Sequence, residues 1–294
     1  MNLLKIKIIV LLERLKKVTL VAEELGLKQP TVSFHMRKME EEWELPLFEI
    51  KTGKVILTEA GKTLHHYAVR IERLYEEAES RLAVMRSGGS KRKFTIGLSA
   101  MAGSLLLHDS QLFAAAAEQQ LQLAFISGKD RELQQSLLDG HTDLIVTGDD
   151  AALPGCITQK IGEEQLVLLL AGSHPAAVPN LSSYRLAQYP LIMLDDDCVA
   201  AAVSRWKQRE DTQLSTSWSS DRIEPIVRAV ADGQGVSIIP GRYPVDSAAG
   251  LITIPLPGTP AVCPLYALWR GDTPEQAFIE RFVRIAKSGF GNNS

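Results

Sequence analysis

The spacing of apolar residues near the start of the chain predicts short helices joined by tight turns. An amphipathic helix is expected over residues 3–15. In the next segment Val21 and Leu25 lie four positions apart and therefore face the same side of a second helix. Thr19 is placed to cap that helix, and Gly26 supplies the left-handed residue that ends it.

A third helix is predicted directly after this turn. Val32, Met36 and Met39 recur at i, i+4 and i+7 and are expected to be buried, while Pro30 fits the first turn, where no N–H is needed. This outline is typical of a helix-turn-helix, although an ordinary helical hairpin with a solvated face has the same pattern. Polar side chains near such a helix N-terminus can reach DNA bases and phosphates. The candidate DNA contacts on the helix are Lys28, Gln29, Pro30, Thr31, Ser33, Phe34, Arg37 and Lys38.

The segment after this helix predicts a β-hairpin. Residues 48–50 alternate between apolar and polar, Thr52-Gly53 is a turn, and residues 55–57 form the return strand. Lys51 and Lys54 flank the turn, where they are placed to touch the DNA backbone or minor groove. The hairpin is therefore expected to act as a wing.

Thr58 is expected to cap a long helix over residues 59–87. Its apolar positions follow a spacing of three and four, which is typical of a coiled-coil seam. We interpret this stripe as a dimer contact, and packing against the chain's own C-terminal domain is the alternative. The stripe includes Leu64, Tyr67, Ile71, Leu74, Ala78 and Leu82.

In order and spacing, these elements resemble the LysR-type transcriptional regulators of bacteria. The motif residues that carry the resemblance are Ala22-Glu23-Glu24-Leu25, Gln29-Pro30, Val32-Ser33, Arg37, Leu47-Phe48-Glu49 and Leu57-Thr58-Glu59-Ala60-Gly61. The chain departs from the family pattern at Lys28, Phe34 and Ile50, where the family commonly has a capping serine, a basic residue and an arginine. Phe34 is expected to pack on a thymine methyl group or a sugar, or to be partly buried within the domain.

Composition limits the classes of function. A chain of 294 residues suggests about two domains. The net charge is −3 and the pI is near 6.1, but residues 1–58 hold ten Lys and Arg against eight Glu, so the positive charge is local. Three cysteines indicate reduced thiols and a cytoplasmic protein. The apolar run at the start is interrupted by Lys5 and Lys7, which argues against an export signal or membrane partner.

Beyond a hinge at Ser87–Ser90, apolar strands alternate with amphipathic helices. This pattern predicts an α/β domain with mostly parallel sheets, including one long helix over residues 103–119. The fold class is thus α+β multidomain, and the resemblance implies a two-lobed effector domain like the periplasmic binding proteins. The expected limits are 1–58 for the winged helix-turn-helix, 59–90 for the linker helix and hinge, and 91–294 for the effector domain. Its lobes are expected at 91–162 with 268–294, and at 163–267.

Ligands of open α/β sheets bind beyond the carboxyl ends of strands. The helix that follows Ser99 would offer free N–H groups to an anion. Asp149, Asp150 and Asp195 to Asp197 are interpreted as solvated loop charges, or alternatively as charges that select a polar or cationic effector. The candidate effector contacts are Ser99, Ala100, Met101, Ser127, Gly128, Thr147, Gly148 and Cys198.

No motif of a nucleophile or metal site is present, so we expect neither an enzyme nor a bound cofactor or metal. The resemblance also suggests a redox role for Cys198, because some peroxide-sensing members of the family use a cysteine near this place, but no second cysteine lies in the helix after it. Cys156 or Cys263 could approach it only through the fold.

The resulting hypothesis is a cytoplasmic regulator that binds an imperfect palindrome in double-stranded DNA as a homodimer or homotetramer. The resemblance implies a small-molecule effector in the interlobe cleft, and RNA polymerase is a further candidate partner. The alternatives are a constitutive DNA-binding regulator with a vestigial cleft and a solute-binding receptor.

Overall fold

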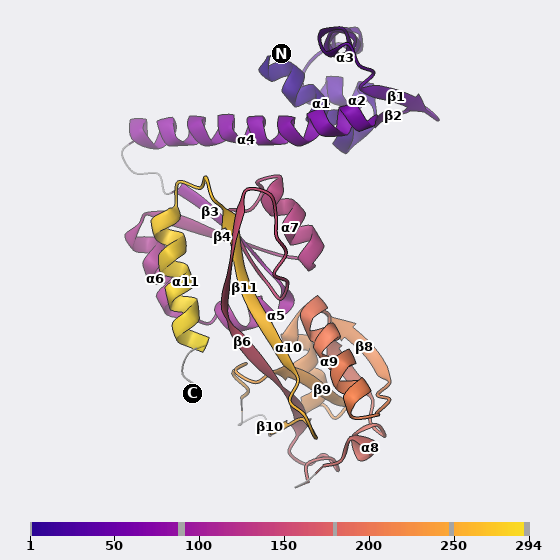
Figure 1. The fold of residues 1–294 in the computed structure, drawn as a ribbon, viewed down its shortest axis with the longest axis vertical. Helices are drawn as coiled ribbons and strands as arrows, with labels where there is room; N and C mark the ends of the chain where they lie inside the picture. The colour runs from indigo at the N-terminus through magenta and orange to yellow at the C-terminus, as the bar shows by residue number, and fades with distance from the viewer. Residues whose placement is uncertain (1, 88–91, 179–180, 247–249, 291–294) are drawn as a thin grey trace. The chain divides into compact units, whose positions relative to one another are not determined.

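The computed structural model describes residues 2–87, 92–178, 181–246 and 250–290, and divides into two compact units, Met1–Arg92 and Lys93–Ser294. Most of the expected hinge therefore lies outside the described residues. Figure 1 shows the elements of each unit. Those of the N-terminal unit are α1 (Leu3–Leu15), α2 (Val18–Glu24), α3 (Gln29–Trp43), β1 (Phe48–Lys51), β2 (Lys54–Leu57) and α4 (Glu59–Ser87).

The three short helices enclose one small apolar core. Ile8 and Leu12 of α1 pack against Val21 of α2 and against Val32 and Met39 of α3. The buried positions of α3 are those expected from their periodicity. Burial of this side fixes which side of α3 remains available to solvent.

Two contacts hold the wing against the helices. The Glu40 carboxylate of α3 accepts the backbone N–H groups of Leu47 and Phe48 at 2.9 and 3.1 Å. The start of α4 approaches the same segment so closely that a Cβ on Gly61 would lie 2.1 Å from the Leu47 carbonyl oxygen. The Thr58 hydroxyl accepts the Gly61 N–H at 3.0 Å, which confirms Thr58 as the cap of α4.

Part of α4 belongs to the core of the N-terminal unit. Ala68 and Val69 are buried, and Leu64 is partly buried against the same cluster. Farther along, Leu74 is 59% exposed and Leu82 is 65% exposed. The expected stripe is therefore divided between an internal contact at its start and an open face beyond it.

The C-terminal unit alternates strands and helices. Its elements are β3 (Arg92–Leu98), α5 (Ala100–Leu106), α6 (Ser110–Glu118), β4 (Leu121–Ser127), α7 (Asp130–Leu138), β5 (Leu144–Thr147), β6 (Cys156–Ala171), α8 (Ser183–Leu186), β7 (Leu191–Leu194), α9 (Asp197–Arg209), β8 (Thr216–Ser220), α10 (Ile223–Ala231), β9 (Val236–Pro240), β10 (Leu251–Pro255), β11 (Val262–Arg270) and α11 (Gln276–Phe290). The strand order is β4-β3-β5-β11-β6-β9-β7-β8, with β10 paired to β6.

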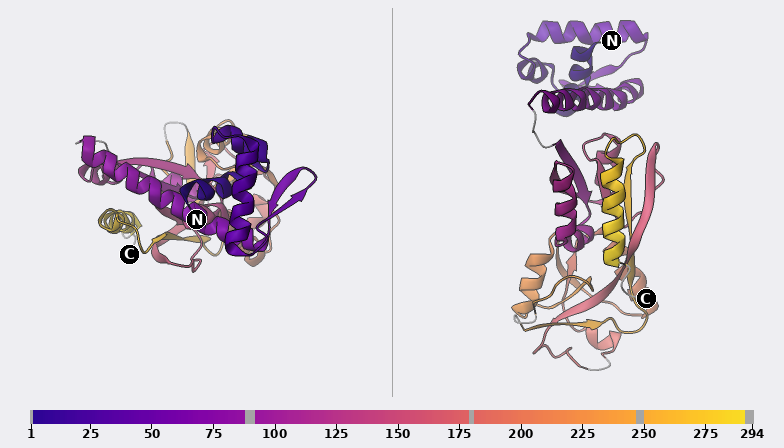
Figure 2. Two further views of the ribbon diagram at one scale, coloured as in Figure 1. Left: turned by 90° about the horizontal axis from the view of Figure 1, so that it is seen from above. Right: turned by 90° about the vertical axis from the view of Figure 1, so that its left-hand side faces the viewer.

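Two long strands join the lobes of this unit. Both β6 and β11 cross from one lobe to the other, antiparallel to each other, and β6 then continues beside β9 and β10. Figures 1 and 2 show β6 running the length of the unit. Lobe 1 holds β3, β4 and β5 with α5, α6, α7 and α11, and lobe 2 holds β7, β8, β9 and β10 with α8, α9 and α10.

Helices cover both faces of the lobe 1 sheet. On β5, Leu144 and Val146 join the large core that includes Phe278 of α11, whereas Ile145 packs with Leu133 of α7. Successive side chains of a strand point to opposite faces, so a strand that is covered on both sides is buried at every position. This explains why β5 is buried at each of its positions.

Three expectations about the elements were wrong. Helix α2 begins at Val18 with Lys17 at its N-cap, so Thr19 lies inside the helix. The single helix expected over 103–119 is two helices, α5 and α6, because Asp109 caps the second through the N–H of Gln111. The sheet was expected to be mostly parallel, but it is mixed. Strands β6 and β11 pair antiparallel with their neighbours, whereas β3 is parallel to β5 and β7 is parallel to β9.

Among the described helices, none has the length and apolar content needed to cross a membrane.

Candidate DNA-binding face and interlobe site

The side of α3 opposite its buried residues is open to solvent. Gln29, Phe34 and Arg37 are exposed, with Phe34 at 52%, while Thr31 and Ser33 are partly exposed. Gly26, at φ +63°, turns the chain from α2 into α3, and Pro30 lies in the first turn of α3 as expected. The polar face therefore projects from a packed support.

The candidate cations of this unit differ in their partners. Lys38 donates to Glu41 at 2.6 Å, and this hydrogen bond raises the pKa of Lys38. Lys51 pairs with Glu49 at 2.7 Å. Within the described residues, the other three candidate cations have no hydrogen bond or ion pair between their side chains and the protein. These are Lys28, Arg37 and Lys54.

The wing presents its residues at a short turn. Thr52 and Gly53 both adopt positive φ, and Lys51 lies opposite Lys54 in the register of β1 and β2. Ile50, at 76%, is exposed on the same hairpin. Unlike the buried Val55 and Leu57 of β2, it does not pack in the core.

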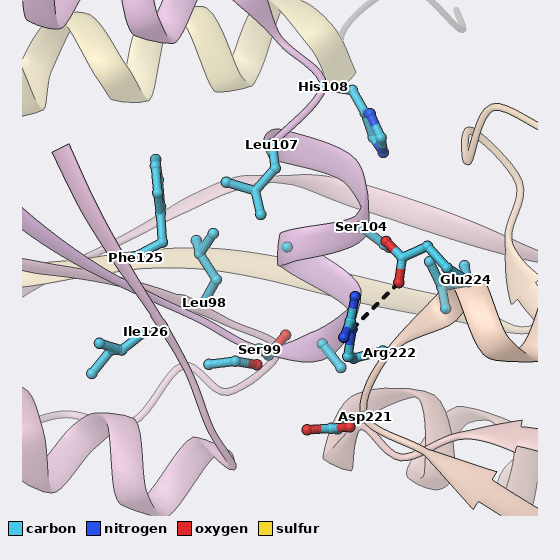
Figure 3. Close-up of a pocket in the computed structure, with 14 residues that line it drawn as sticks. Leu98, Ser99, Ser104, Leu107, His108, Phe125, Ile126, Asp221, Arg222 and Glu224 are labelled. Carbon is cyan, nitrogen blue, oxygen red and sulfur yellow. Dashed lines mark ion pairs between the residues drawn. The ribbon is translucent and has the colours of Figure 1, made fainter.

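Two adjoining cavities lie between the lobes of the C-terminal unit. The first, here called the apolar cavity, has a volume of about 400 Å³ and is formed by α5, the end of β4 and the start of α10. The second, the polar cavity, has a volume of about 470 Å³ and lies beside the N-terminus of α7. They share Ala100, Ser127 and Asp221, so they adjoin each other, and they are here called the connected cavities. Figure 3 shows the apolar cavity.

The lining of the apolar cavity has an apolar and a charged side. Figure 3 shows Leu98, Leu107, Phe125 and Ile126 on the lobe 1 side. Asp221, Arg222 and Glu224 come from lobe 2, and Arg222 pairs with Glu224 at 3.7 Å.

Half of the candidate effector contacts line these cavities. They are Ser99, Ala100, Ser127 and Gly128. The remaining four, Met101, Thr147, Gly148 and Cys198, line neither.

Those four residues are used in packing. The Thr147 side chain is buried, and its hydroxyl bonds to the backbone N–H and carbonyl of Asp149 at 3.1 and 3.2 Å. Gly148 lies so close to α9 that a Cβ there would be 2.2 Å from the Cys198 Cβ. Met101 is fully buried.

A buried carboxylate connects the lobes beside the cavities. Asp196 is 2% exposed and accepts the N–H of Met101 at 2.8 Å, across the lobe boundary. Its other oxygen accepts the N–H groups of Cys198 and Val199 at 3.0 and 3.2 Å and so caps α9. The interpretation of this residue as a solvated loop charge was wrong, because it satisfies the N-termini of α5 and α9 together.

Neighbouring groups reinforce this contact. Lys129 of lobe 1 binds the Asp195 carboxylate at 2.5 Å and its carbonyl at 3.0 Å, and the Asp130 N–H donates to Asp197 at 3.1 Å. One Asp130 carboxylate oxygen is buried and has no hydrogen-bond partner among the described residues. Burial, followed by the charges of Asp196, Asp197 and Asp149, raises the pKa of Asp130 to about 7.

Of the two cysteines that could approach Cys198 through the fold, Cys263 is the one in contact with it. All three cysteines are free thiols. The hydrogen bond with Cys198, and then burial, raise the pKa of the Cys263 thiol. Both effects oppose formation of the thiolate that redox reactions of cysteine need.

A winged helix-turn-helix unit and a two-lobed domain with interlobe cavities define a DNA-binding regulator that has an effector-binding domain. The corresponding family models match the chain. Residues 3–62 match the bacterial regulatory helix-turn-helix proteins of the lysR family, and residues 87–291 match the LysR substrate binding domain. The chain belongs to the LysR family of bacterial transcriptional regulators.

Similar proteins agree with this assignment. The RuBisCO operon transcriptional regulator of Allochromatium vinosum is 28% identical over 225 residues, which cover 75% of this chain and 73% of that one. The fold is similar to ArgP from Mycobacterium tuberculosis, with a TM-score of 0.69, 19% identity and 97% of each chain covered. It is also similar to full-length CbnR complexed with its target DNA, with a TM-score of 0.66, 17% identity, and coverage of 97% of this chain and 100% of that one.

Proposed function

We propose that this regulator reads an imperfect palindromic operator with α3 and its wing, as a dimer or a dimer of dimers. The observation that carries the proposal is the exposed polar face of α3, on which Arg37 has no ionic partner among the described residues. An exposed guanidinium on a recognition helix can make paired hydrogen bonds to guanine, and Gln29 can do so to adenine.

The wing and the start of α3 would hold the protein in register on the duplex. Lys28 and Lys54 are exposed and free of ion pairs within the described part of the chain, so they can neutralise phosphates without first breaking a contact. Lys38 and Lys51 would have to give up Glu41 and Glu49. We therefore assign the larger electrostatic contributions to the unpaired cations.

The open face of α4 is the proposed dimer contact. Tyr67, Ile71, Leu74 and Leu82 are exposed along it. Pairing two copies through this stripe would remove apolar area from water and place two recognition helices on one DNA. Because DNA is the proposed partner, we place the protein in the cytoplasm. Contacts with RNA polymerase are part of the same proposal, and no catalytic residue is assigned.

Control is proposed to come from a small molecule in the connected interlobe cavities. The cavities are lined by residues of both lobes, so a ligand there can bind one arrangement of the lobes more tightly than another. This differential affinity is the physical requirement for an effector. No cofactor or metal is needed for this role.

Titration of the full chain into labelled DNA from upstream of its own gene tests the DNA-binding proposal. Fluorescence anisotropy should show tighter binding to this DNA than to a scrambled duplex, with an affinity that falls as salt rises. Equal affinity for both duplexes over the full range of salt would reject site-specific binding.

A further inference from the structure

The anion position at the start of α5 is already filled by the protein itself. The N–H of Met101 points to Asp196, which accepts it at 2.8 Å and is 2% exposed. A carboxylate effector at this helix end would have to displace a buried group that also caps α9 through Cys198 and Val199. Displacement would leave those N–H groups without their acceptor, which opposes it.

The connected cavities carry an excess of negative charge. Of the cations that line them, Arg222 pairs with Glu224 at 3.7 Å and Lys129 pairs with Asp195 at 2.5 Å. The lining also contains two further acids, Glu132 and Asp221, so the lining as a whole is negative.

These two acids are not equivalent. Glu132 accepts the backbone N–H of Lys129 at 3.2 Å and so takes part in capping α7. Asp221 has no hydrogen bond or ion pair from its side chain to the described residues, and it lies where the two cavities join. Figure 3 shows Asp221 below Arg222 in the view, and its dashed line joins Arg222 to Glu224.

The opposite wall would take an uncharged part of a ligand. Leu98, Leu107, Phe125 and Ile126 of lobe 1 line it, and Ile223 adds an apolar side chain from lobe 2. A volume of about 400 Å³ can hold a ring or a short alkyl chain. Apolar and acidic groups thus face the same space from different sides.

We propose that the effector is an organic cation, whose ammonium or guanidinium group binds Asp221 and whose apolar part lies against Phe125 and its neighbours. In this arrangement Asp196 determines specificity, because it denies the α5 N-terminus to carboxylates. The inference rests on the proposed effector control and names the chemical class of the ligand.

A pair of probes with the same ring and opposite charge tests the inference on the full chain. Phenethylamine hydrochloride and sodium 3-phenylpropionate are titrated at matched ionic strength and pH by ligand-observed NMR. For probes of this size a Kd on the order of 1 mM is expected for the amine. The carboxylate should bind at least about tenfold more weakly, since it meets an acidic lining.

Two single substitutions test whether the amine binds at Asp221. Asp221→Asn keeps the shape of the side chain, removes its charge, and should raise the Kd of phenethylamine about fivefold or more. Asp150→Asn removes an exposed aspartate that lines neither cavity, and it should leave that Kd unchanged. Circular dichroism of both variants checks that the fold is kept.

Three results would overturn the inference. They are equal or tighter binding of the carboxylate, an unchanged amine Kd in Asp221→Asn, and no binding of either probe up to about 20 mM. Fluorescence anisotropy with the upstream DNA, measured on the same samples, shows whether only the proposed ligand class is wrong or whether the proposed regulator function is wrong as well. Intact DNA binding with any of these results rejects only the ligand class, whereas loss of specific DNA binding by the wild type rejects the regulator itself.

Discussion

On α3, Arg37 is exposed without an ionic partner in the described residues, whereas between the lobes Lys129 is bound to Asp195 at 2.5 Å. The proposed DNA-binding face leaves Lys28, Arg37 and Lys54 unpaired among the described residues, whereas Lys38 and Lys51 are paired with acids. The interlobe region uses charged groups to hold the protein's own elements together. We therefore interpret the unpaired Arg37 of the first region as a group for recognition, and the paired Lys129 and buried Asp196 of the second as groups that hold the lobes together.

The two regions also differ in how far apart along the chain their contacting residues lie. Buried and exposed positions on α3 alternate within a single helix of 15 residues. By contrast, Asp196 binds Met101, which lies 95 residues earlier in the chain. The pattern of residues along the sequence therefore predicts which side of α3 is exposed. It does not predict the contact between Asp196 and Met101, which depends on the fold.

Replacing Asp196 should have the largest effect. Asp196→Ala removes the acceptor of three N–H groups at the N-termini of α5 and α9. We expect the free energy of unfolding of the C-terminal unit to fall by about 2–4 kcal/mol, measured by urea denaturation. Asp150→Ala, which removes an exposed aspartate, is the matched control. A loss no greater than that of the control would show that the contact does not support the unit.

The corresponding change in the N-terminal unit is Gly61→Ala. The new methyl group would lie 2.1 Å from the Leu47 carbonyl oxygen, so α4 and the wing would have to move apart. A loss of about 1–3 kcal/mol is expected in the same kind of measurement. Gly289→Ala in α11, where nothing lies within 4 Å of the added Cβ, provides the control and should be neutral or stabilising. Equal effects of both changes would contradict the role of close approach.

A substitution in the exposed apolar stripe of α4 should weaken the proposed dimer. Leu74→Lys places a charge on the proposed dimer contact and should raise the dimer dissociation constant about tenfold or more, measured by sedimentation equilibrium. Glu76→Lys introduces the same residue on a different side of the helix, where Glu76 is exposed, and should change it much less. An unchanged constant in Leu74→Lys would remove α4 from the interface.

A further prediction concerns the pH dependence of stability. Burial and nearby aspartates raise the pKa of Asp130 from 3.8 to about 7. Because the folded unit holds this proton more tightly than the unfolded chain, stability should fall as pH rises from about 4 to about 7 and level off above that. In Asp130→Asn this contribution is gone, so the melting temperature should fall less between pH 5 and 8. Parallel curves for wild type and variant would contradict the raised pKa.

Much of the fold followed from periodicity and capping residues. The apolar spacing on α1 and α3, the turn at Gly26 and the cap at Thr58 depend on neighbours within a few residues, so the sequence contains them. The break between α5 and α6 was missed because the apolar pattern continues past Asp109. The mixed sheet was missed because apolar strands read alike whether their partners are parallel or antiparallel.

The candidate site was predicted less completely. Strand ends indicated Ser99 and Ser127, which line the cavities. The lobe 2 side of the apolar cavity, with Arg222, Ile223 and Glu224, was not in the prediction, although these residues directly follow Asp221 at the end of β8. The short, largely exposed strand β8 lacks the apolar run that marks a buried strand, so the sequence did not predict that strand.

The most direct test compares Arg37→Ala with Lys38→Ala in binding to the operator. Both changes remove one cation from neighbouring positions of α3, but within the described part of the chain only Lys38 is paired with an acid, Glu41. Anisotropy titrations should show a loss of about tenfold or more for Arg37→Ala and a loss several times smaller for Lys38→Ala. Wild-type affinity in Arg37→Ala would contradict the account that this face of α3 enters the DNA.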